Sequence, residues 1–401
     1  MDAYWLRNVR LEKGYLNREG RLQTDTELAN IKVADGQFAE LSFTDPGGVD
    51  CEGINCEGRL LLPSLRESHI HIDKTYFGGP WRSCAKGKDF LGKLEEEKSL
   101  LPELLRMMPE RTQKLVELLL SNGHTHIQAQ CNVDPIIGTQ NYRRVKEVLE
   151  TYTDKLTYQL VAFPQHGLLR SNSLPHMRRA LEEGADVVGG LDPCLLDKDV
   201  NRSLTATFQL AVEYDRPVDI HLNEQNSLGL YTLNRICDMT EKYAWQGRVS
   251  INSALALSDI DSNSLQAIVQ RMAKLGIAVS TSCILDRPIP IPYLDQAGVR
   301  VALGHDSIFD HFSCFGTGDT IEKLCSVATC FKMSDEISLG QLMKFATGGI
   351  TPLDATGKRC WPAIGDTASF LLTKASSSAE LIARRKPIVA LYFQGRRVFH
   401  D

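Results

Sequence analysis

The pattern of hydrophobic and polar positions changes twice along the chain. Over roughly the first sixty residues, short apolar stretches are interrupted by turns such as the Asp35-Gly36 pair, and helical periodicity is absent. From Pro63 onward, short apolar runs alternate with charged segments of helical periodicity. The tail returns to the strand-like pattern in ASFLLT and IVALYFQGRRVF. The two ends of the chain therefore predict strands without helices, and the middle predicts strands that alternate with helices.

The middle of the chain predicts a barrel of parallel strands. Its apolar runs, which predict strands, include 125–133, 158–164, 186–191, 217–222, 248–257, 277–283 and 300–306. Helical patterns such as 141–156 and 264–276 separate them. Strands that alternate with helices of this length form parallel βαβ units, and about eight such pairs fit before residue 350. We predict a (β/α)8 TIM-like barrel over 63–350, flanked by a small β-sandwich domain that 1–62 and 351–401 form together.

Charge and composition indicate which kinds of molecule this protein binds. The 401 residues carry a formal net charge of -5 with acidic and basic side chains interspersed, so no basic surface for nucleic acid or membrane lipid is indicated. A small-molecule partner is expected instead. The chain opens without a signal peptide and contains no run of ~20 apolar residues, which predicts a cytoplasmic protein. Its 11 cysteines form no CxxC pair and are expected to be free thiols.

Polar residues that follow the apolar runs carry the candidate chemistry, because barrel enzymes place reactive groups at the carboxyl ends of their strands. His69 and His71 are two apart, so a strand directs both imidazoles to the same face. A later run ends at His221, with Glu224 three residues on, and another ends in the His305-Asp306 pair. Imidazoles and a carboxylate from separate strand ends form a nitrogen and oxygen ligand set that suits Zn2+ or Fe2+ and leaves a position for water.

Four segments resemble a known family. LPSLRESHIHIDKTY, LVAFPQHGLL, PVDIHLNEQN and LGHDSIFDHF are similar, in order and separation, to motifs of the amidohydrolase superfamily, in particular of the cytosine deaminases and the related N-isopropylammelide amidohydrolase. The resemblance covers nearly the whole chain. It implies a metal-dependent hydrolase acting on a carbon-nitrogen bond other than a peptide bond, with one divalent ion per chain, Zn2+ before Fe2+. Assembly into a homo-oligomer is expected, as is common for such barrels.

The resemblance also implies roles for individual residues. His69, His71, His221 and Asp306 would bind the metal, and Asp306 would take a proton from water. Glu224 would pass protons to the substrate ring and the departing amine, while Gln165 would hydrogen-bond the amide edge of the ring. Further expected substrate-binding residues are Lys74, Trp81 and Ser253. His305 is interpreted as a supporting or packing histidine rather than as a ligand.

Four positions depart from the family pattern, of which Ser369 in GDTASFLL is remote and is interpreted as structural. Ser253 stands where the family usually has a histidine that contacts the reacting centre, and Gln130 and Asn132 stand where relatives often have histidine and aspartate. Loss of one electrostatic stabiliser commonly costs ~10^2 to 10^3 in rate, so cytosine itself is predicted to be a poor substrate.

Three functions remain open from the sequence. The leading hypothesis is deamination of a small cyclic amidine, imine or amide with release of ammonia. The second is removal of an N-substituent from a heterocycle, which Lys74 favours. The third is a catalytically degenerate barrel that keeps its metal and binds a small heterocyclic ligand. The zinc deaminases with an H-x-E and P-C-x-x-C signature are excluded, because no such cysteine pair is present.

Overall fold

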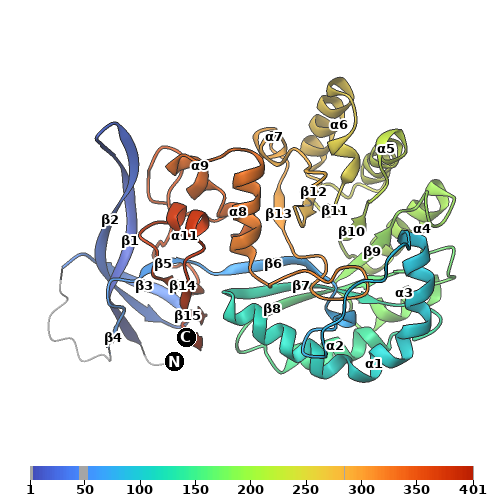
Figure 1. Cartoon of the computed structure of the whole chain (residues 1–401), viewed down its shortest axis with the longest axis horizontal. Helices are drawn as coiled ribbons and strands as arrows, with labels where there is room; N and C mark the ends of the chain where they lie inside the picture. Colours follow the sequence, from blue (N-terminus) through green and yellow to red (C-terminus); the bar gives the residue numbers. More distant parts are fainter. Residues whose placement is uncertain (1–2, 45–52, 284, 401) are drawn as a thin grey trace.

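The computed structural model describes residues 3–44, 53–283 and 285–400, which form two sheets with helices around the larger part (Figure 1). One 8-stranded sheet has the order β13-β12-β11-β10-β9-β8-β7-β6, and its paired strands are parallel. Its strands are β6 (Leu65–Ile70), β7 (His124–Asn132), β8 (Thr157–Phe163), β9 (Val187–Leu191), β10 (Val218–His221), β11 (Val249–Asn252), β12 (Ala278–Thr281) and β13 (Val301–Leu303). The predicted barrel is confirmed.

Contacts between the first and last strands close the barrel. Ile70 and Asp306 form a parallel bridge, in which the backbone N–H of His71 donates to the carbonyl of Asp306 and that of Asp306 donates to the carbonyl of His69. Gly304 permits this approach, because a Cβ there would lie 2.7 Å from the backbone nitrogen of His69. The closure thus fixes the positions of the strand ends that carry the candidate site.

Amphipathic helices connect the strands and cover the outside of the barrel. They are α1 (Phe90–Ser121), α2 (Gln140–Glu150), α3 (Leu174–Glu182), α4 (Val200–Tyr214), α5 (Asn226–Lys242), α6 (Ser262–Leu275), α7 (Ile291–Gln296) and α8 (Thr320–Cys330). Side-chain caps begin several of them: Asp89, for example, accepts from the backbone N–H of Gly92 at the start of α1. Two turns, η1 (Ile72–Lys74) and η2 (Leu255–Ser258), follow β6 and β11.

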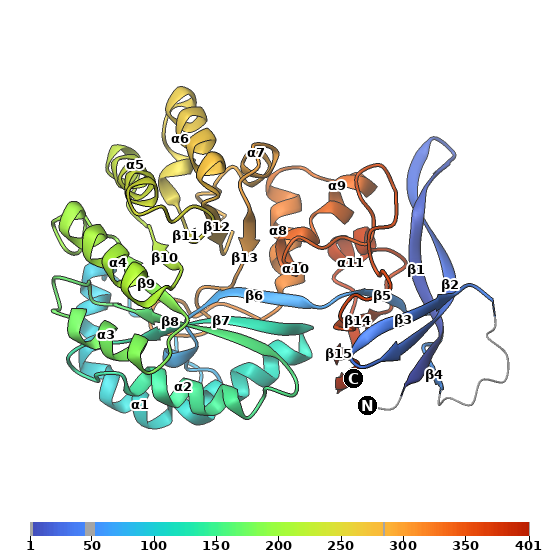
Figure 2. The ribbon, with the colours of Figure 1, turned by 180° about the vertical axis from the view of Figure 1, so that it is seen from behind.

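Strands from both ends of the chain form the second sheet (Figure 2). Its order is β16-β15-β14-β5-β1-β2-β3, with β4 beside β1. These strands are β1 (Tyr4–Arg18), β2 (Arg21–Ala34), β3 (Gln37–Ser42), β4 (Gly53–Asn55), β5 (Leu60–Pro63), β14 (Phe370–Thr373), β15 (Ile388–Phe393) and β16 (Arg396–His400). Its buried face includes Phe38, Trp361 and Phe370, and the Phe370 ring stacks on Tyr392 at 4.4 Å. The short helices α9 (Glu336–Gln341) and α10 (Lys344–Thr347) lie between the barrel and β14 in the sequence, and α11 (Ser378–Arg384) connects β14 to β15.

The second sheet confirms a separate β domain built from both termini, although its strands belong to one continuous mixed sheet rather than to two stacked ones. The exact boundaries at 62/63 and 350/351 remain a prediction. Every cysteine that the structure describes is free, whereas Cys51 lies outside the described residues. No helix in the described part of the chain has the length and apolar character needed to cross a bilayer.

Candidate active site

Four side chains converge at the carboxyl end of the barrel. His69 lies on β6, His71 directly follows it, His221 ends β10 and Asp306 follows β13. Their potential ligand atoms all lie within 4.8 Å of one another. Asp306 Oδ1 is 3.3 Å from Nε2 of both His69 and His71, and Nε2 of His71 is 3.1 Å from Nε2 of His221. Ring nitrogens that face each other at this distance need a proton or a cation between them, so the donor set fits a divalent metal ion.

The protonation states of His71, His221 and Asp306 suit a metal. Burial lowers the pKa of His69, but the hydrogen bond and charge of Asp306 outweigh it and raise this pKa, so His69 must lose a proton when a metal binds. Burial and the ammonium of Lys74 lower the pKa of His71 to about 4, and burial with the neighbouring imidazoles brings the pKa of His221 well below its ordinary value. Burial disfavours the charged form of Asp306, but hydrogen bonds from His69 and His71 outweigh it and hold the pKa of this carboxyl well below its usual range. Neutral imidazoles and an ionised carboxylate are the forms that coordinate metals.

Glu67 and Gln130 form hydrogen-bond contacts with His69 of the ligand cluster. Glu67 Oε1 accepts the backbone N–H of both His69 and His305 at 3.0 Å, and its Oε2 lies 2.5 Å from Nδ1 of His305. His305 therefore ties β13 to β6 and lies outside the ligand group, as its interpretation as a supporting residue requires. The side-chain amide of Gln130 lies 3.2 Å from Nδ1 of His69. When Nε2 of His69 faces the metal, Nδ1 carries the proton, and the amide oxygen of Gln130 can accept it in the flipped orientation.

A cavity of about 300 Å3 opens above the cluster. Its lining residues are His71, Lys74, Lys88, Phe90, Lys93, Phe163, Gln165, Leu191, His221, Asn223, Asp306, Ser307 and Phe312. The volume is at the lower end of the range for small-molecule sites. Aromatic rings, amides and ammonium groups therefore surround the space in front of the candidate metal site.

Lys74 and Gln165 meet in the wall of this cavity. The Lys74 ammonium donates to Oε1 of Gln165 at 2.8 Å and lies 3.4 Å from Oε1 of the buried Glu97. Because a lysine can only donate, this contact orients the Gln165 side chain with its NH2 group free to donate elsewhere. Glu97 in turn lies 3.4 Å from His166, so Lys74 is held by a buried charge network based on Glu97 rather than on its neighbour Asp73.

Glu224 is buried, but its carboxylate is already bound. Oε1 accepts the backbone N–H groups of Cys194 and Leu195 at 2.7 and 2.8 Å, and Oε2 accepts the hydroxyl of Thr232. The residue is not among those that line the cavity. Gly229 allows this packing, because a Cβ there would lie 2.2 Å from the carbonyl oxygen of Glu224. Three hydrogen bonds therefore hold the carboxylate, and the side chain is absent from the cavity lining.

Two other expected residues lie away from the lining. Trp81 is 76% exposed and Ser253 is 8% exposed, and neither lines the cavity. Ser253 follows β11 with a φ of 67°, and its backbone N–H donates to the carbonyl of Ser280. Their substrate-binding roles remain predictions. Lys88, Lys93 and Phe312 line the cavity although the sequence did not single them out. The two lysines lie beside and in a long helix, where charged positions have the appearance of a solvated face.

Comparison with known proteins agrees with this geometry. The chain is 37% identical over 403 residues to YahJ of Escherichia coli (strain K12), described as uncharacterized, covering 99% of this chain and 87% of that protein. The structure of N-isopropylammelide isopropylaminohydrolase from Burkholderia multivorans superimposes with a TM-score of 0.88 at 28% identity, covering 100% of this chain and 99% of that one. The 5-methylcytosine deaminase from Klebsiella pneumoniae gives a TM-score of 0.81 at 22% identity, covering 99% and 98% of the two chains, which shows a shared fold.

A family model described as "Amidohydrolase family" matches residues 102–399, which is most of the chain. The matched region contains β7 to β13 of the barrel, with His221 and Asp306, and the carboxyl-terminal strands of the second sheet. With a relative at 37% identity over 99% of the chain as well, the protein belongs to the amidohydrolase family.

Proposed function

We propose that this protein hydrolyses a carbon-nitrogen bond of a small nitrogen heterocycle and releases ammonia or an amine. The convergence of His69, His71, His221 and Asp306 beneath a cavity of about 300 Å3 is the observation that carries the proposal. Three imidazoles and one carboxylate favour Zn2+, with Fe2+ as the second choice. When bound, such an ion supplies Lewis acidity and the activation of water at neutral pH.

The chain's own groups would bind the ring and move protons. Gln165 presents its NH2 group to a ring carbonyl or ring nitrogen, because Lys74 occupies its oxygen. Asp306 would accept a proton from the attacking water. Glu224, which Thr232 and the loop amides position, would deliver protons to the ring and the leaving nitrogen. Phe163 and Phe312 offer apolar surface to a planar ring.

The leaving group is the main alternative within this proposal. Deamination releases ammonia, whereas removal of an N-substituent releases an amine through the same hydrolytic step. The second reaction is favoured by the similarity at 28% identity to an enzyme titled N-isopropylammelide isopropylaminohydrolase, and by Lys74 in the cavity wall. Both reactions need the same metal ligands, so the leaving group has to be identified by experiment.

The charge of the cavity restricts the substrate further. Lys74, Lys88 and Lys93 line it, and Asp306 is the carboxylate on that lining. Lys74 and Lys88 are partnered by Glu97 and Glu96, at 3.4 and 3.0 Å. Lys93 donates to the carbonyl of Phe312 at 3.1 Å and pairs with no carboxylate of the described residues. We therefore propose that the heterocycle carries an anionic or strongly accepting group on the side away from the metal.

Ammonia and amine release by the metal-replete protein tests the proposal. Pyrimidines, triazines, pterins and creatinine-like rings, each with and without a carboxylate substituent, form the panel. Turnover of one ring class is expected, and cytosine is expected to stay below a kcat/KM of ~10^4 per molar per second because Ser253 supplies no imidazole. Ring binding without any turnover would favour the degenerate binding protein, and efficient cytosine turnover would show that Ser253 is no impediment.

A further inference from the structure

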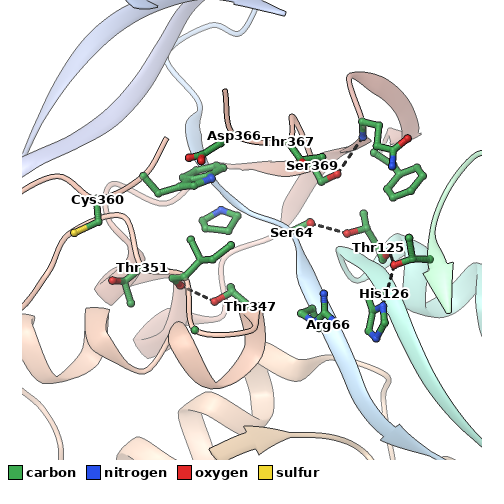
Figure 3. A pocket seen from close by; sticks show the side chains of 17 residues that line it. Ser64, Arg66, Thr125, His126, Thr347, Thr351, Cys360, Asp366, Thr367 and Ser369 are labelled. Carbon is green, nitrogen blue, oxygen red and sulfur yellow. Dashed lines mark hydrogen bonds between the residues drawn. The ribbon is translucent and has the colours of Figure 1, made fainter. Parts of the chain in front are cut away.

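A second and larger cavity, of about 710 Å3, lies at the opposite end of the barrel strands (Figure 3). Its barrel wall is built at the amino ends of three neighbouring strands, by Arg66 of β6, Thr125 and His126 of β7, and Thr157 of β8. Its other wall comes from the carboxyl-terminal part of the chain, at 347–351, 360–361, 366–369 and 393–394. The cavity therefore lies at the junction between the barrel and the second sheet, and none of its lining residues lines the candidate active site.

Arg66 places an unpaired guanidinium in this cavity. Within residues 3–44, 53–283 and 285–400, no carboxylate lies within ion-pair distance of it and no group accepts its hydrogen bonds. Burial lowers the pKa of the guanidinium, and no neighbouring charge offsets this effect. Gly348 makes room for the side chain, because a Cβ there would lie 2.8 Å from Cδ of Arg66. A partly buried arginine without a protein partner takes its acceptors from water or from a ligand in the cavity.

His126 lies at the same end of the cavity as Arg66 in Figure 3 and adds no second charge. Burial, together with the charge of Arg66, lowers the pKa of His126 to about 3, so its imidazole is neutral. The hydroxyl of Thr157 donates to the carbonyl of Thr125, which leaves its oxygen to accept from Nδ1 of His126 at 2.9 Å. Nε2 of His126 is then an acceptor that has no partner among the described residues.

Hydroxyl groups and apolar surface complete the lining. The oxygens of Ser64 and Thr125 lie 2.6 Å apart, and because only one of them donates in this contact, the other keeps a hydrogen for a further acceptor. Pro63, Ile350, Trp361 and Phe393 provide apolar surface. Asp366 also lines the cavity, but its Oδ2 accepts the backbone N–H of Ala363 and it forms no ion pair with Arg66. The volume lies within the range of small-molecule sites, ~300 to 1,000 Å3.

We propose that this cavity is a binding site for a small organic monocarboxylate that also carries a hydroxyl or amino donor. The planar carboxylate would pair with the guanidinium of Arg66, and the donor would bind Nε2 of His126. A guanidinium matches a carboxylate through two parallel hydrogen bonds. One positive charge without a second cation favours a monoanion over a doubly charged phosphate.

A binding role and a structural role of Arg66 differ in their effect on stability. Replacement of a structural arginine breaks contacts within the protein. Replacement of an arginine that contacts only a ligand breaks none in the ligand-free protein. Arg66→Gln is therefore expected to keep or raise the melting temperature of the ligand-free protein. A fall in the melting temperature of both Arg66→Gln and Arg66→Lys would show that the side chain has a structural role and would overturn the proposal.

Binding is tested by ligand-detected NMR titration of the Zn2+-loaded full chain with 4-hydroxybenzoate, acetate and inorganic phosphate. The Kd for 4-hydroxybenzoate is expected to rise about tenfold or more in Arg66→Gln and less in Arg66→Lys. Arg106→Gln is the matched control, because this arginine is exposed on α1 and lies outside both cavities. Lys93→Gln tests for binding in the active-site cavity.

Three results would overturn the proposal. The first is no binding of either carboxylate to the wild type at about 10 mM. The second is binding that Arg66→Gln leaves unchanged, in particular if Lys93→Gln removes it. The third is tighter binding of phosphate than of either carboxylate, which would assign a different anion to the site. These outcomes do not depend on turnover, so they are independent of the proposed hydrolase function.

Discussion

At the scale of single residues, existing hydrogen bonds distinguish a side chain that faces the cavity from one that is bound to the protein. The Gln165 side chain is oriented by Lys74 and lines the cavity, so it is organised for binding before any ligand arrives. Glu224 is equally buried, but both of its carboxylate oxygens are bound to the protein. A catalytic role for Glu224 therefore requires a contact with substrate beyond these three bonds, as is common when catalytic contacts form only with substrate present.

Replacement of Glu224 by glutamine tests this role. We expect Glu224→Gln to lower kcat by at least ~10^2 because an amide cannot carry protons, with unchanged metal content because no ligand is altered. Steady-state kinetics on a substrate from the panel and elemental analysis give the two readings. Thr232→Val, which removes one bond that holds the carboxylate, serves as the control and should change kcat far less. Retention of most activity by Glu224→Gln would contradict the proton-transfer role.

Lys93 tests the proposed charge of the substrate. We expect Lys93→Gln to raise KM about tenfold for a carboxylate-bearing ring and to leave KM for its uncharged analogue nearly unchanged. Lys98→Gln is the matched control, because Lys98 lies on the same helix, pairs with Glu95 and does not line the cavity. Equal effects on charged and uncharged rings would show that Lys93 does not select for charge.

At the scale of elements, the pairing of β6 with β13 determines whether the metal ligands meet. Backbone hydrogen bonds of His69 and His71 with Asp306 join the two strand ends. Glu67 also binds both strand ends, through the N–H groups of His69 and His305. Gly304 is the position where the two strands are too close for a side chain. A change there should disturb the metal site without altering any ligand.

Gly304→Ala is the corresponding test. Its Cβ would lie within 2.8 Å of three His69 atoms, so β13 must move, and we expect a loss of about 1 to 3 kcal/mol in unfolding free energy with reduced metal occupancy. Gly190→Ala in β9 is the control, because its Cβ would meet only the side chain of Ile220, at 3.3 Å. Urea unfolding and elemental analysis measure both effects. Equal losses in the two variants would contradict a special role for this contact.

The helices and strands also show which features of the fold and the site could be predicted from the sequence. Alternation of apolar runs and helical patterns predicted the barrel, because it depends on local periodicity. Strand-end histidines indicated a metal site at the common edge of parallel strands, and the family resemblance then implied which four residues form it. The partners of Glu224 were not predictable, since Cys194 and Thr232 approach it from other elements. Arg66 likewise looked like any charged strand residue, because its lack of a partner appears only in the folded chain.

At the scale of the whole molecule, the same strands serve two cavities. β6 carries Arg66 near its start, with His69 three residues later and His71 directly after its end, so the cavity at the domain junction and the candidate metal site lie at opposite ends of one strand. In both views β6 starts beside the second sheet and runs away from it, so the carboxyl end of this strand lies away from that sheet (Figures 1 and 2). Barrel enzymes place catalysis at that carboxyl end, which assigns the candidate active site to the metal cluster.

The metal should also stabilise the fold as a whole. Its four ligands come from the ends of β6, β10 and β13, so a bound ion links the first and last strands of the barrel to a strand between them. Among the described residues one such ligand group occurs, which predicts one ion per chain by elemental analysis. An ion at a thousand times its Kd adds about 4.1 kcal/mol to stability, so chelation should lower the melting temperature and Zn2+ should restore it.

His221→Ala separates this linkage from nonspecific effects of the chelator. The variant loses one of the four ligands, so its melting temperature should lie near that of the chelated wild type and should respond little to chelator or to added Zn2+. Calorimetry of both proteins with and without chelator makes the comparison. Two ions per chain, no ion after purification with added metal, or equal chelator sensitivity of variant and wild type would each contradict a single structural and catalytic ion at this site.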